Sequence, residues 1–254
     1  MTWWDAVFLA AAGVLGGLTG SIAGLASVAT YPALLLVGLP PVTANVTNTV
    51  ALVFNGIGSV WGSRPELAGQ GTWIKRILPA AALGGATGAA LLLSTPAEGF
   101  EKIVPILLGL ASVAIVIPSR AIRQARVANH QRHTATVLIE STAIFLICIY
   151  GGYFGAAAGV MLLALLLRAG GATLAHANAG KNVILGVANS VAAVAFMIFA
   201  PVHWLAVIPM GIGCLLGSRL GPMVVRHAPA RPLRVAIGVA GMALAVKLGV
   251  DAYP

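Results

Sequence analysis

Long apolar runs separated by short polar gaps set the pattern of this chain. Each run is close to the roughly 20 residues that a helix needs to cross a bilayer, and none shows the short alternating segments of a membrane β-barrel. Helices then remain as the structure that satisfies every backbone group in lipid. The pattern predicts an all-α, polytopic integral membrane protein with helical segments at about 5–20, 22–38, 43–62, 74–94, 101–117, 134–150, 152–168, 180–199, 203–218 and 233–250.

Glycines interrupt two neighbouring pairs of these segments. Gly16-Gly17 and Gly20 fall at the boundary of the first pair, and Gly151-Gly152 and Gly155 fall at the boundary of the sixth and seventh segments. Each pair is either two full spans or a re-entrant hairpin. Both alternatives return the chain to the side from which it entered, so the rest of the topology is the same.

The two halves of the chain carry similar motifs in the same order. Each half holds an odd number of spans, whether its glycine-broken pair forms two full spans or a re-entrant hairpin. The halves should therefore enter the membrane upside down relative to each other. We therefore expect two inverted repeats of about five helical segments, at 1–118 and 134–254, joined by a basic cytoplasmic linker at 119–133. The matching motifs are Gly20-x-x-x-Gly24 with Gly155-x-x-x-Gly159, Asn48 and Asn55 with Asn182 and Asn189, and Pro79 with Pro209.

The composition indicates lipid as the main solvent of this chain. Hydrophobic residues make up 59% of the sequence and charged residues 8%, with a mean hydropathy of +0.97. A soluble domain carries about a quarter of its residues as charged side chains. The first apolar run has no basic segment before it, so no cleaved signal peptide is expected. We expect a multi-pass protein of a bacterial inner (plasma) membrane, with membrane lipid around it.

The net charge of +9 reflects topology and excludes nucleic acid as a partner. The basic residues are spread over short gaps between apolar runs, without the polar and aromatic groups that read nucleic acid. If the 118–133 gap is cytoplasmic, thirteen of the fifteen Lys and Arg residues fall on that side and only Lys102 and Lys247 fall outside. This is the distribution of the positive-inside rule.

Asparagines form matching polar stripes at the starts of two segments, one in each half. The stripes repeat at helical spacing, so their members share one face of an apolar helix. Amides offer donors and acceptors, Lys181 adds a charge, and helix N-termini favour an anion. Together they predict an anion site near the middle of the membrane. The candidate substrate-binding residues are Ser21, Asn45, Thr47, Asn48 and Asn55 in the first half, and Asn178, Lys181, Asn182 and Asn189 in the second.

Each of these residues also has a purely structural interpretation. Asparagines in membrane helices often hydrogen-bond across a helix interface and bind nothing else. Lys181 would also be placed correctly as one more cytoplasmic positive residue. The glycines near the segment boundaries would serve close helix packing, or would break the helices and expose backbone N–H groups to a substrate. The sequence alone leaves these alternatives open.

Glu140 is the candidate for ion coupling. An acidic residue inside a membrane helix is a coupling candidate by default. Glu140 and Asp5 both lie early in a helix, however, where a carboxylate also stabilises the helix dipole. The sequence holds no metal-ligand spacing, ATP-binding loop or catalytic motif, so no metal, cofactor or primary pumping is expected.

The motifs of the second half resemble a known family. Gly151-Gly152-Tyr153-Phe154-Gly155-Ala156-Ala157-Ala158-Gly159, followed by Ala177-Asn178-Ala179-Gly180-Lys181-Asn182, resembles the TauE/SafE family of sulfite exporters, and the stretch 20–55 is similar to its amino-terminal repeat. The resemblance implies transport of sulfite, sulfonates or related small organic anions, driven by an ion gradient. The sequence differs from that family at Ala26-Ser27-Val28, where many members carry a glycine cluster.

We therefore expect a secondary transporter or exporter of a small anion, with sulfite or an organosulfonate as the favoured substrate. The alternatives are a structural or assembly protein of the membrane and, less favoured, a membrane-embedded enzyme. The enzyme would need several titratable groups at one depth, and the chain offers only Lys181 and Glu140. The sequence leaves a homo-oligomer, the coupling ion and the direction of transport open.

Overall fold

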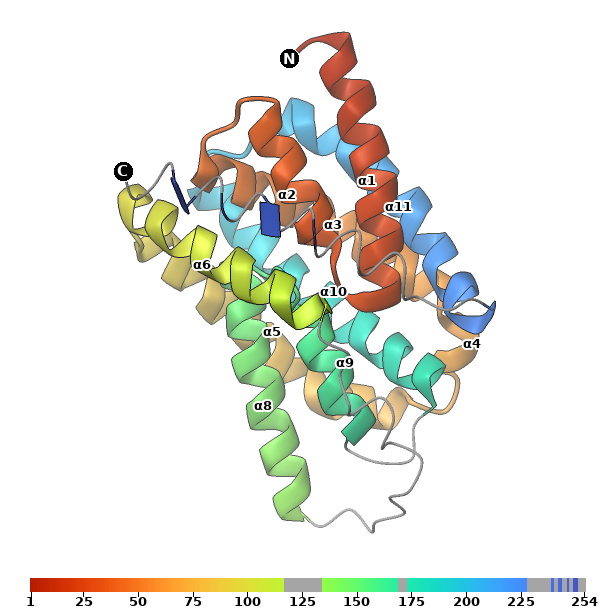
Figure 1. Ribbon diagram of the computed structural model, residues 1–254. Coiled ribbons are helices and arrows are strands. Elements are labelled where there is room, and N and C mark those ends of the chain that lie inside the picture. Colours follow the sequence, from red (N-terminus) through yellow and green to blue (C-terminus); the bar gives the residue numbers. More distant parts are fainter. Residues whose placement is uncertain are drawn as a thin grey trace.

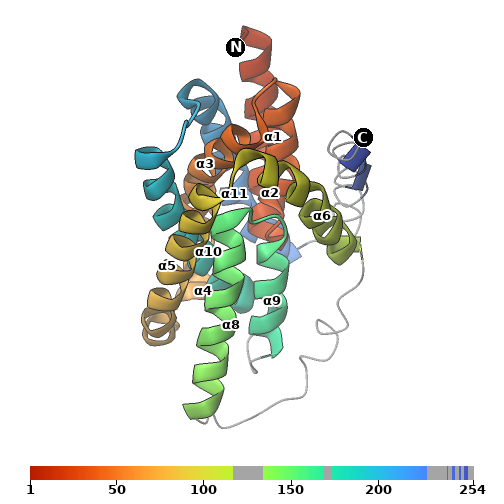
Figure 2. The same cartoon turned by 90° about the vertical axis from the view of Figure 1, so that its left-hand side faces the viewer.

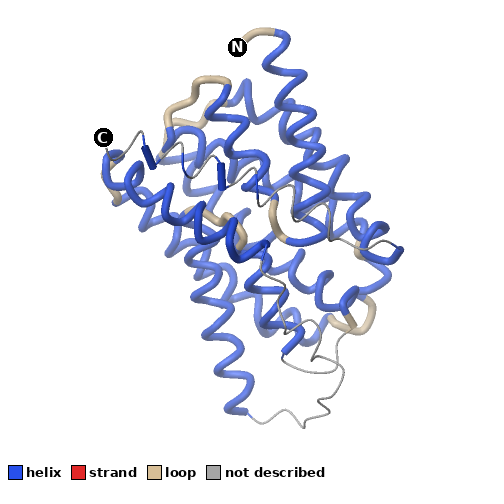
Figure 3. The backbone as a smooth tube through the Cα atoms, in the orientation of Figure 1, coloured by secondary structure: helices blue, strands red, loops and turns tan. Residues whose placement is uncertain are grey.

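The computed structural model describes residues 1–116, 134–168 and 173–227, together with positions 239, 242–243, 246 and 249–250 (Figure 1). Regular structure in these residues is entirely helical, which confirms the all-α prediction (Figure 3). The predicted linker and most of the predicted last segment lie outside the described residues. The helices are α1 (Trp3–Ala23), α2 (Ala26–Leu36), α3 (Pro41–Gly62), α4 (Arg64–Leu67), α5 (Gly71–Ser94), α6 (Ala97–Val116), α8 (Thr134–Tyr153), α9 (Ala158–Arg168), α10 (Leu174–Phe199) and α11 (Trp204–His227).

Several helices have the length and surface of membrane spans. Within the described part of the chain, four helices are long and apolar enough to cross a membrane, namely Trp3–Ala23, Gly71–Ser94, Leu174–Phe199 and Trp204–Val225. Their outer faces carry large apolar side chains such as Leu83, Ile198 and Ile208, each more than half exposed. Lipid chains solvate such a surface and water does not. The chain is therefore a multi-pass integral membrane protein.

The first helix pair breaks at Gly24, a few residues after the predicted boundary. Gly24 has φ +75°, a left-handed conformation that glycine adopts without strain, and it ends α1. Gly17 lies inside α1, where a Cβ would stand 2.4 Å from the backbone oxygen of Cys214. Gly13 and Gly17 thus serve close packing on α11, whereas a Cβ on Gly16 or Gly20 would meet Thr30 or Ala26 of α2, and these glycines do not interrupt the helix.

The second break lies at Gly155, between α8 and α9, within the predicted glycine stretch. Gly155 also has φ +75°, so its conformational counterpart in the first half is Gly24, whereas the motif comparison paired it with Gly20. The helices that follow the two breaks, α2 and α9, have 11 residues each. At ~1.5 Å per residue they rise about 16 Å, half of a hydrocarbon core of ~30 Å. Each broken pair is thus one long helix followed by a half-length helix.

Helices of the two halves pack against each other in matching pairs. α1 packs on α11, and α5 packs on α8. Both contacts depend on glycine, because a Cβ at Gly13 would lie 2.3 Å from the backbone oxygen of Met210, and one at Gly88 would lie 2.1 Å from that of Ile149. α1 and α8, which open the two halves, run in opposite directions (Figures 1 and 2).

The two breaks and one helix crossing meet in the centre of the molecule. α3 and α10 pack together with Gly56 against Gly186, where a Cβ on Gly56 would lie 3.0 Å from the Cα of Gly186. Gly24 meets Gly159 of α9 even more closely, since its Cβ would lie 2.2 Å from the Cα of Gly159. Small residues from both halves therefore bring four backbone segments together at one place.

Candidate functional site

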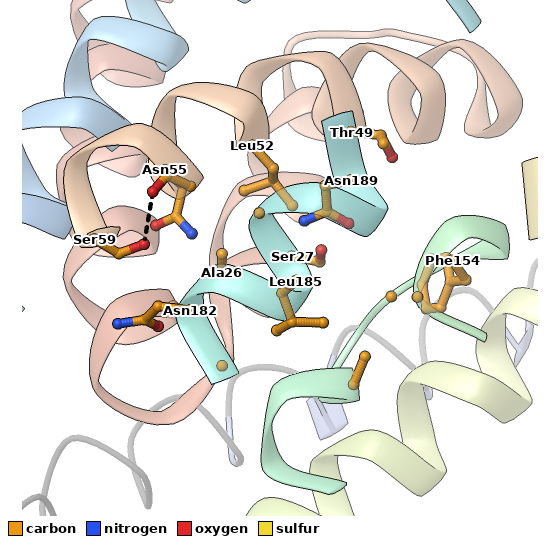
Figure 4. Close-up of a pocket in the computed structure, with 17 residues that line it drawn as sticks. Ala26, Ser27, Thr49, Leu52, Asn55, Ser59, Phe154, Asn182, Leu185 and Asn189 are labelled. Carbon is orange, nitrogen blue, oxygen red and sulfur yellow. Dashed lines mark hydrogen bonds between the residues drawn. The ribbon is translucent and has the colours of Figure 1, made fainter. Parts of the chain in front are cut away.

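A small cavity lies between the two helix breaks and the crossing of α3 and α10 (Figure 4). Its volume is about 30 Å³. A cavity of ~10–15 Å³ on this measure holds one water, so this one suits a few waters or a small ion. The residues that line it are Gly20, Gly24, Ala26, Ser27, Thr49, Leu52, Asn55, Gly56, Ser59, Gly151, Phe154, Gly155, Ala158, Asn182, Leu185, Gly186 and Asn189.

The cavity faces the N-termini of the two half-length helices. Ala26, the first residue of α2, and Ala158, the first residue of α9, both line it. No side chain caps the start of α2 at Leu25. The N-terminus of a helix presents free N–H groups and the positive end of the helix dipole, which favour an anion. The sequence predicted this role for the starts of α3 and α10, whereas the structure brings the starts of α2 and α9 to the cavity.

Amide and hydroxyl groups form the polar part of the lining. Asn55 of α3 comes from one side, and Asn182 and Asn189 of α10 come from the other (Figure 4). The side-chain oxygen of Asn55 is buried and has no hydrogen-bond partner, while Asn182 donates to the hydroxyl of Ser63 at 3.2 Å. No Asp, Glu, Lys or Arg is among the described residues that line the cavity.

Lys181 lies next to the cavity and binds the end of α1. Its ammonium donates to the backbone oxygens of Gly20 at 2.9 Å and of Ser21 at 3.2 Å, and its side chain is fully buried. Asn178 donates to the same Ser21 oxygen at 2.9 Å. The C-terminal carbonyls of a helix form its negative end, so a cation there stabilises the break. Gly20 also lines the cavity, so only the backbone of Gly20 separates the ammonium group of Lys181 from the cavity.

The other half uses an asparagine in the same way. Asn45, near the start of α3, donates through its side-chain nitrogen to the backbone oxygen of Tyr153 at 2.9 Å. Tyr153 is the last residue of α8, just before the second break. α10 thus binds the end of α1 through a charged side chain, and α3 binds the end of α8 through an uncharged one.

Three further predicted residues use their polar groups inside the protein. Asn48 accepts from the hydroxyl of Thr30 at 2.5 Å and donates to that of Ser27 at 3.1 Å. Thr47 accepts from the backbone nitrogen of His203 at 3.0 Å, just before α11 begins. The hydroxyl of Ser21 donates to backbone oxygens of its own helix.

The structure therefore divides the candidate residues into two groups. Asn55, Asn182 and Asn189 line the cavity. The remaining six use their polar groups in hydrogen bonds inside the protein, five of them to another segment and Ser21 to its own helix, because a buried polar group needs a partner. Those six are Ser21, Asn45, Thr47, Asn48, Asn178 and Lys181.

Glu140 lies outside the lining of this cavity, on the first part of α8. Its side chain is only 6% exposed, and its Oε1 atom has no hydrogen-bond partner. A buried carboxyl group with an unsatisfied oxygen is costly in a protein interior, so a ligand that bonds to this oxygen would be stabilising.

Sequence reasoning missed Ser59 and Thr49 as members of the lining. Ser59 follows Asn55 by four residues, so it extends the same helix face and was within reach of the periodicity argument. Thr49 likewise follows Asn45 by four residues, so the same argument applied to it. Among the described residues, no group of three or more His, Cys, Asp or Glu could hold a metal ion.

Comparison with known proteins places the whole chain in one family. The family model described as sulfite exporter TauE/SafE matches residues 9–248. A probable membrane transporter protein, ORF9 of Sinorhizobium sp., is 29% identical over 96% of this chain and 92% of its own length. The probable membrane transporter YfcA of Escherichia coli K12 is 24% identical, over 94% and 88%. A probable membrane transporter of Haemophilus influenzae is 23% identical, over 94% and 92%.

No solved structure matches this chain. The family match covers both halves and both helix breaks, and the related proteins cover the chain almost from end to end. The names of these relatives describe membrane transporters and no enzyme. The chain belongs to the sulfite exporter TauE/SafE family of membrane transporters.

Proposed function

We propose that the protein is a secondary transporter of a small anion, sulfite or an organosulfonate, and that the central cavity is its substrate site. The observation that carries the proposal is the meeting of the α2 and α9 N-termini at one polar cavity. Half-length helices with their positive ends at the middle of a membrane are a known way to hold an anion in transporters. The name of the matching family supports sulfite as the first anion to test.

The size of the cavity favours the smaller of the two substrates. A volume of about 30 Å³ suits an ion of a few atoms better than one with an organic tail. The amides of Asn55, Asn182 and Asn189 would donate to the anion oxygens, as would the free N–H groups at the starts of α2 and α9. Lys181 would add positive potential while it keeps its bonds to α1.

The inverted repeat stays a part of this proposal. The pairing of α1 with α11 is matched by that of α8 with α5, and α3 crosses α10 at the centre. Such symmetry would let the two halves open the cavity alternately to each side. The proposed boundaries, 1–118 and 134–254 with a cytoplasmic linker between them, are testable. Single cysteines at Ala128 and Ala252, in a chain without Cys148 and Cys214, should be labelled from opposite sides.

A flux assay tests the function. Purified protein in liposomes should move sulfite faster than protein-free liposomes do, and short sulfonates, thiosulfate and sulfate should compete to different degrees. If none of these anions is moved or competes, and none raises the unfolding temperature of the protein, the structural or assembly role is favoured instead. Labelling of the two single cysteines from the same side would contradict the inverted topology, but it would not bear on which anion is transported.

A further inference from the structure

A groove runs along the side of the α3–α10 crossing that faces away from the central cavity. It has a volume of about 540 Å³, and its walls are mainly the valines and isoleucine of the two helices, among them Val53, Ile57, Val187 and Val191. Gly56 and Gly186 line both the groove and the cavity. The closest approach of α3 and α10 therefore separates the two.

Basic and aromatic side chains stand at one end of the groove. Trp61 and Arg64 line it there, and Arg64 is its only charged residue among the described ones. The guanidinium carbon of Arg219, from α11, lies 4.2 Å from the centroid of the Trp61 ring, and that of Arg64 lies 5.8 Å from it. Two guanidinium groups thus converge on one half-exposed indole. With Glu66 of α4 included, this end keeps one net positive charge.

The length of the groove fits within one leaflet of a bilayer. Its lining extends from Val53 to Trp61 on α3 and from Val183 to Val191 on α10, with Arg64 of α4 at the end. Eight residues at ~1.5 Å each rise about 12 Å, which fits within half of a hydrocarbon core of ~30 Å. The apolar part therefore lies at the depth of acyl chains, and the arginines with Trp61 lie at the depth of headgroups, where tryptophan is enriched.

We propose that this groove binds an anionic phospholipid, with an acyl chain along α3 and α10 and the phosphate between Arg64 and Arg219. Arginine is suited to this because its planar fork binds phosphate oxygens in pairs. Valine, glycine and Ser190 leave the groove wide enough for a chain. On the expected orientation the lipid comes from the cytoplasmic leaflet, whose anionic lipids attract basic side chains. The proposal does not depend on which anion is transported.

Lipid binding to the full-length protein tests this proposal. In mixed micelles of constant detergent, phosphatidylglycerol should raise the unfolding temperature more than phosphatidylcholine does, and native mass spectrometry should retain the anionic lipid. The double variant R64Q/R219Q should lower the affinity for phosphatidylglycerol on the order of tenfold to thirtyfold. R76Q, which removes an exposed arginine of α5 outside the groove, should leave it unchanged.

A second pair of variants tests the acyl-chain part of the groove. V187F fills the groove and should weaken the binding of phosphatidylglycerol and phosphatidylcholine alike, whereas V194F, on the exposed side of α10 outside the lining, should not. Equal binding of phosphatidylglycerol by the wild type and R64Q/R219Q would overturn the proposal. So would a dimer in solution that V187F dissociates while lipid binding stays the same, because a second copy would then cover the groove.

Discussion

The ammonium nitrogen of Lys181 lies 2.9 Å from the backbone oxygen of Gly20, a residue 161 positions earlier in the chain. This bond joins Lys181, the eighth residue of α10, to the end of α1, beside a cavity that Gly20 itself lines. It explains how a fully buried lysine is tolerated inside a membrane protein, since helix-end carbonyl groups solvate its charge. It also makes Lys181 part of both the fold and the proposed site.

Replacing Lys181 with alanine should therefore reduce both stability and anion binding. The buried oxygens of Gly20 and Ser21 would lose a charged donor, which costs ~1–3 kcal/mol in unfolding free energy. Loss of the nearby charge should weaken sulfite binding roughly tenfold or more. Lys181→Arg should restore these properties only in part, because a planar fork fills the space differently. Thermal unfolding and sulfite titration in detergent measure the two effects.

Lys75→Ala is the matched control for this experiment. Lys75 is an exposed residue of α5, so its loss removes the same charge without touching the break. We expect wild-type stability and binding from it. If Lys181→Ala also retained both, the bond to Gly20 would have no part in the fold or in the site.

Gly24→Ala should prevent correct folding. The added Cβ would lie 2.2 Å from the Cα of Gly159, and alanine is strained at φ +75°. Gly38 separates these two causes, because it has φ +88° but nothing within 4 Å of an added Cβ. Gly38→Ala should therefore cost only the ~1–2 kcal/mol of a left-handed residue. Folded yield by size-exclusion chromatography compares the two, and equal yields would show that the contact with Gly159 is unimportant.

Asn55→Ala should weaken anion binding while the protein stays folded. The side-chain oxygen of Asn55 has no partner, so its amide is held less tightly than those that bind helix ends. A hydrogen bond to a charged group contributes ~1.5–3 kcal/mol, which corresponds to about a ten- to hundredfold loss of affinity. Asn189→Ala should act in the same direction. Ser190 is next to Asn189 in the chain but does not line the cavity, so Ser190→Ala should bind sulfite normally. If Ser190→Ala lost as much sulfite affinity as Asn189→Ala, a general packing defect of α10 would explain both.

Glu140→Gln should separate transport from its driving force. Glutamine keeps the size of the buried side chain but cannot release a proton, so flux down a sulfite gradient should continue while acceleration by a pH gradient is lost. Asp5→Asn is the control, since Asp5 caps the start of α1 through Thr2 and should not affect coupling. A pH-gradient response that persists in Glu140→Gln would remove Glu140 from the coupling mechanism.

The sequence predicted the helices well because apolar length and polar gaps are local properties. The segment predicted at 74–94 is the helix Gly71–Ser94, and the one at 43–62 is Pro41–Gly62. The break at Gly24 was missed by a few residues, since only tertiary contact shows which of several glycines packs and which one turns the chain. A sequence pattern shows neither the φ of Gly24 nor the backbone of Gly159 against it.

The candidate site was predicted in part for the same reason. The polar stripes drew attention to the first turns of α3 and α10, but helical spacing says nothing about which partner each amide will find. Lys181 finds Gly20, and Asn45 finds Tyr153, over distances in sequence that no local pattern covers. Asn55, Asn182 and Asn189 lie further along the same stripes, and they reach the cavity because α3 and α10 cross there.

The position of a bound anion tests the central claim most directly. Selenite has the shape and charge of sulfite, and selenium scatters X-rays anomalously, so crystals grown with selenite would show the anion itself. The account predicts an anomalous peak in the cavity, within hydrogen-bond reach of Asn55 or Asn182 and of the first turns of α2 and α9, and its loss in the presence of excess sulfite. A sulfite-sensitive peak elsewhere in the protein would contradict it.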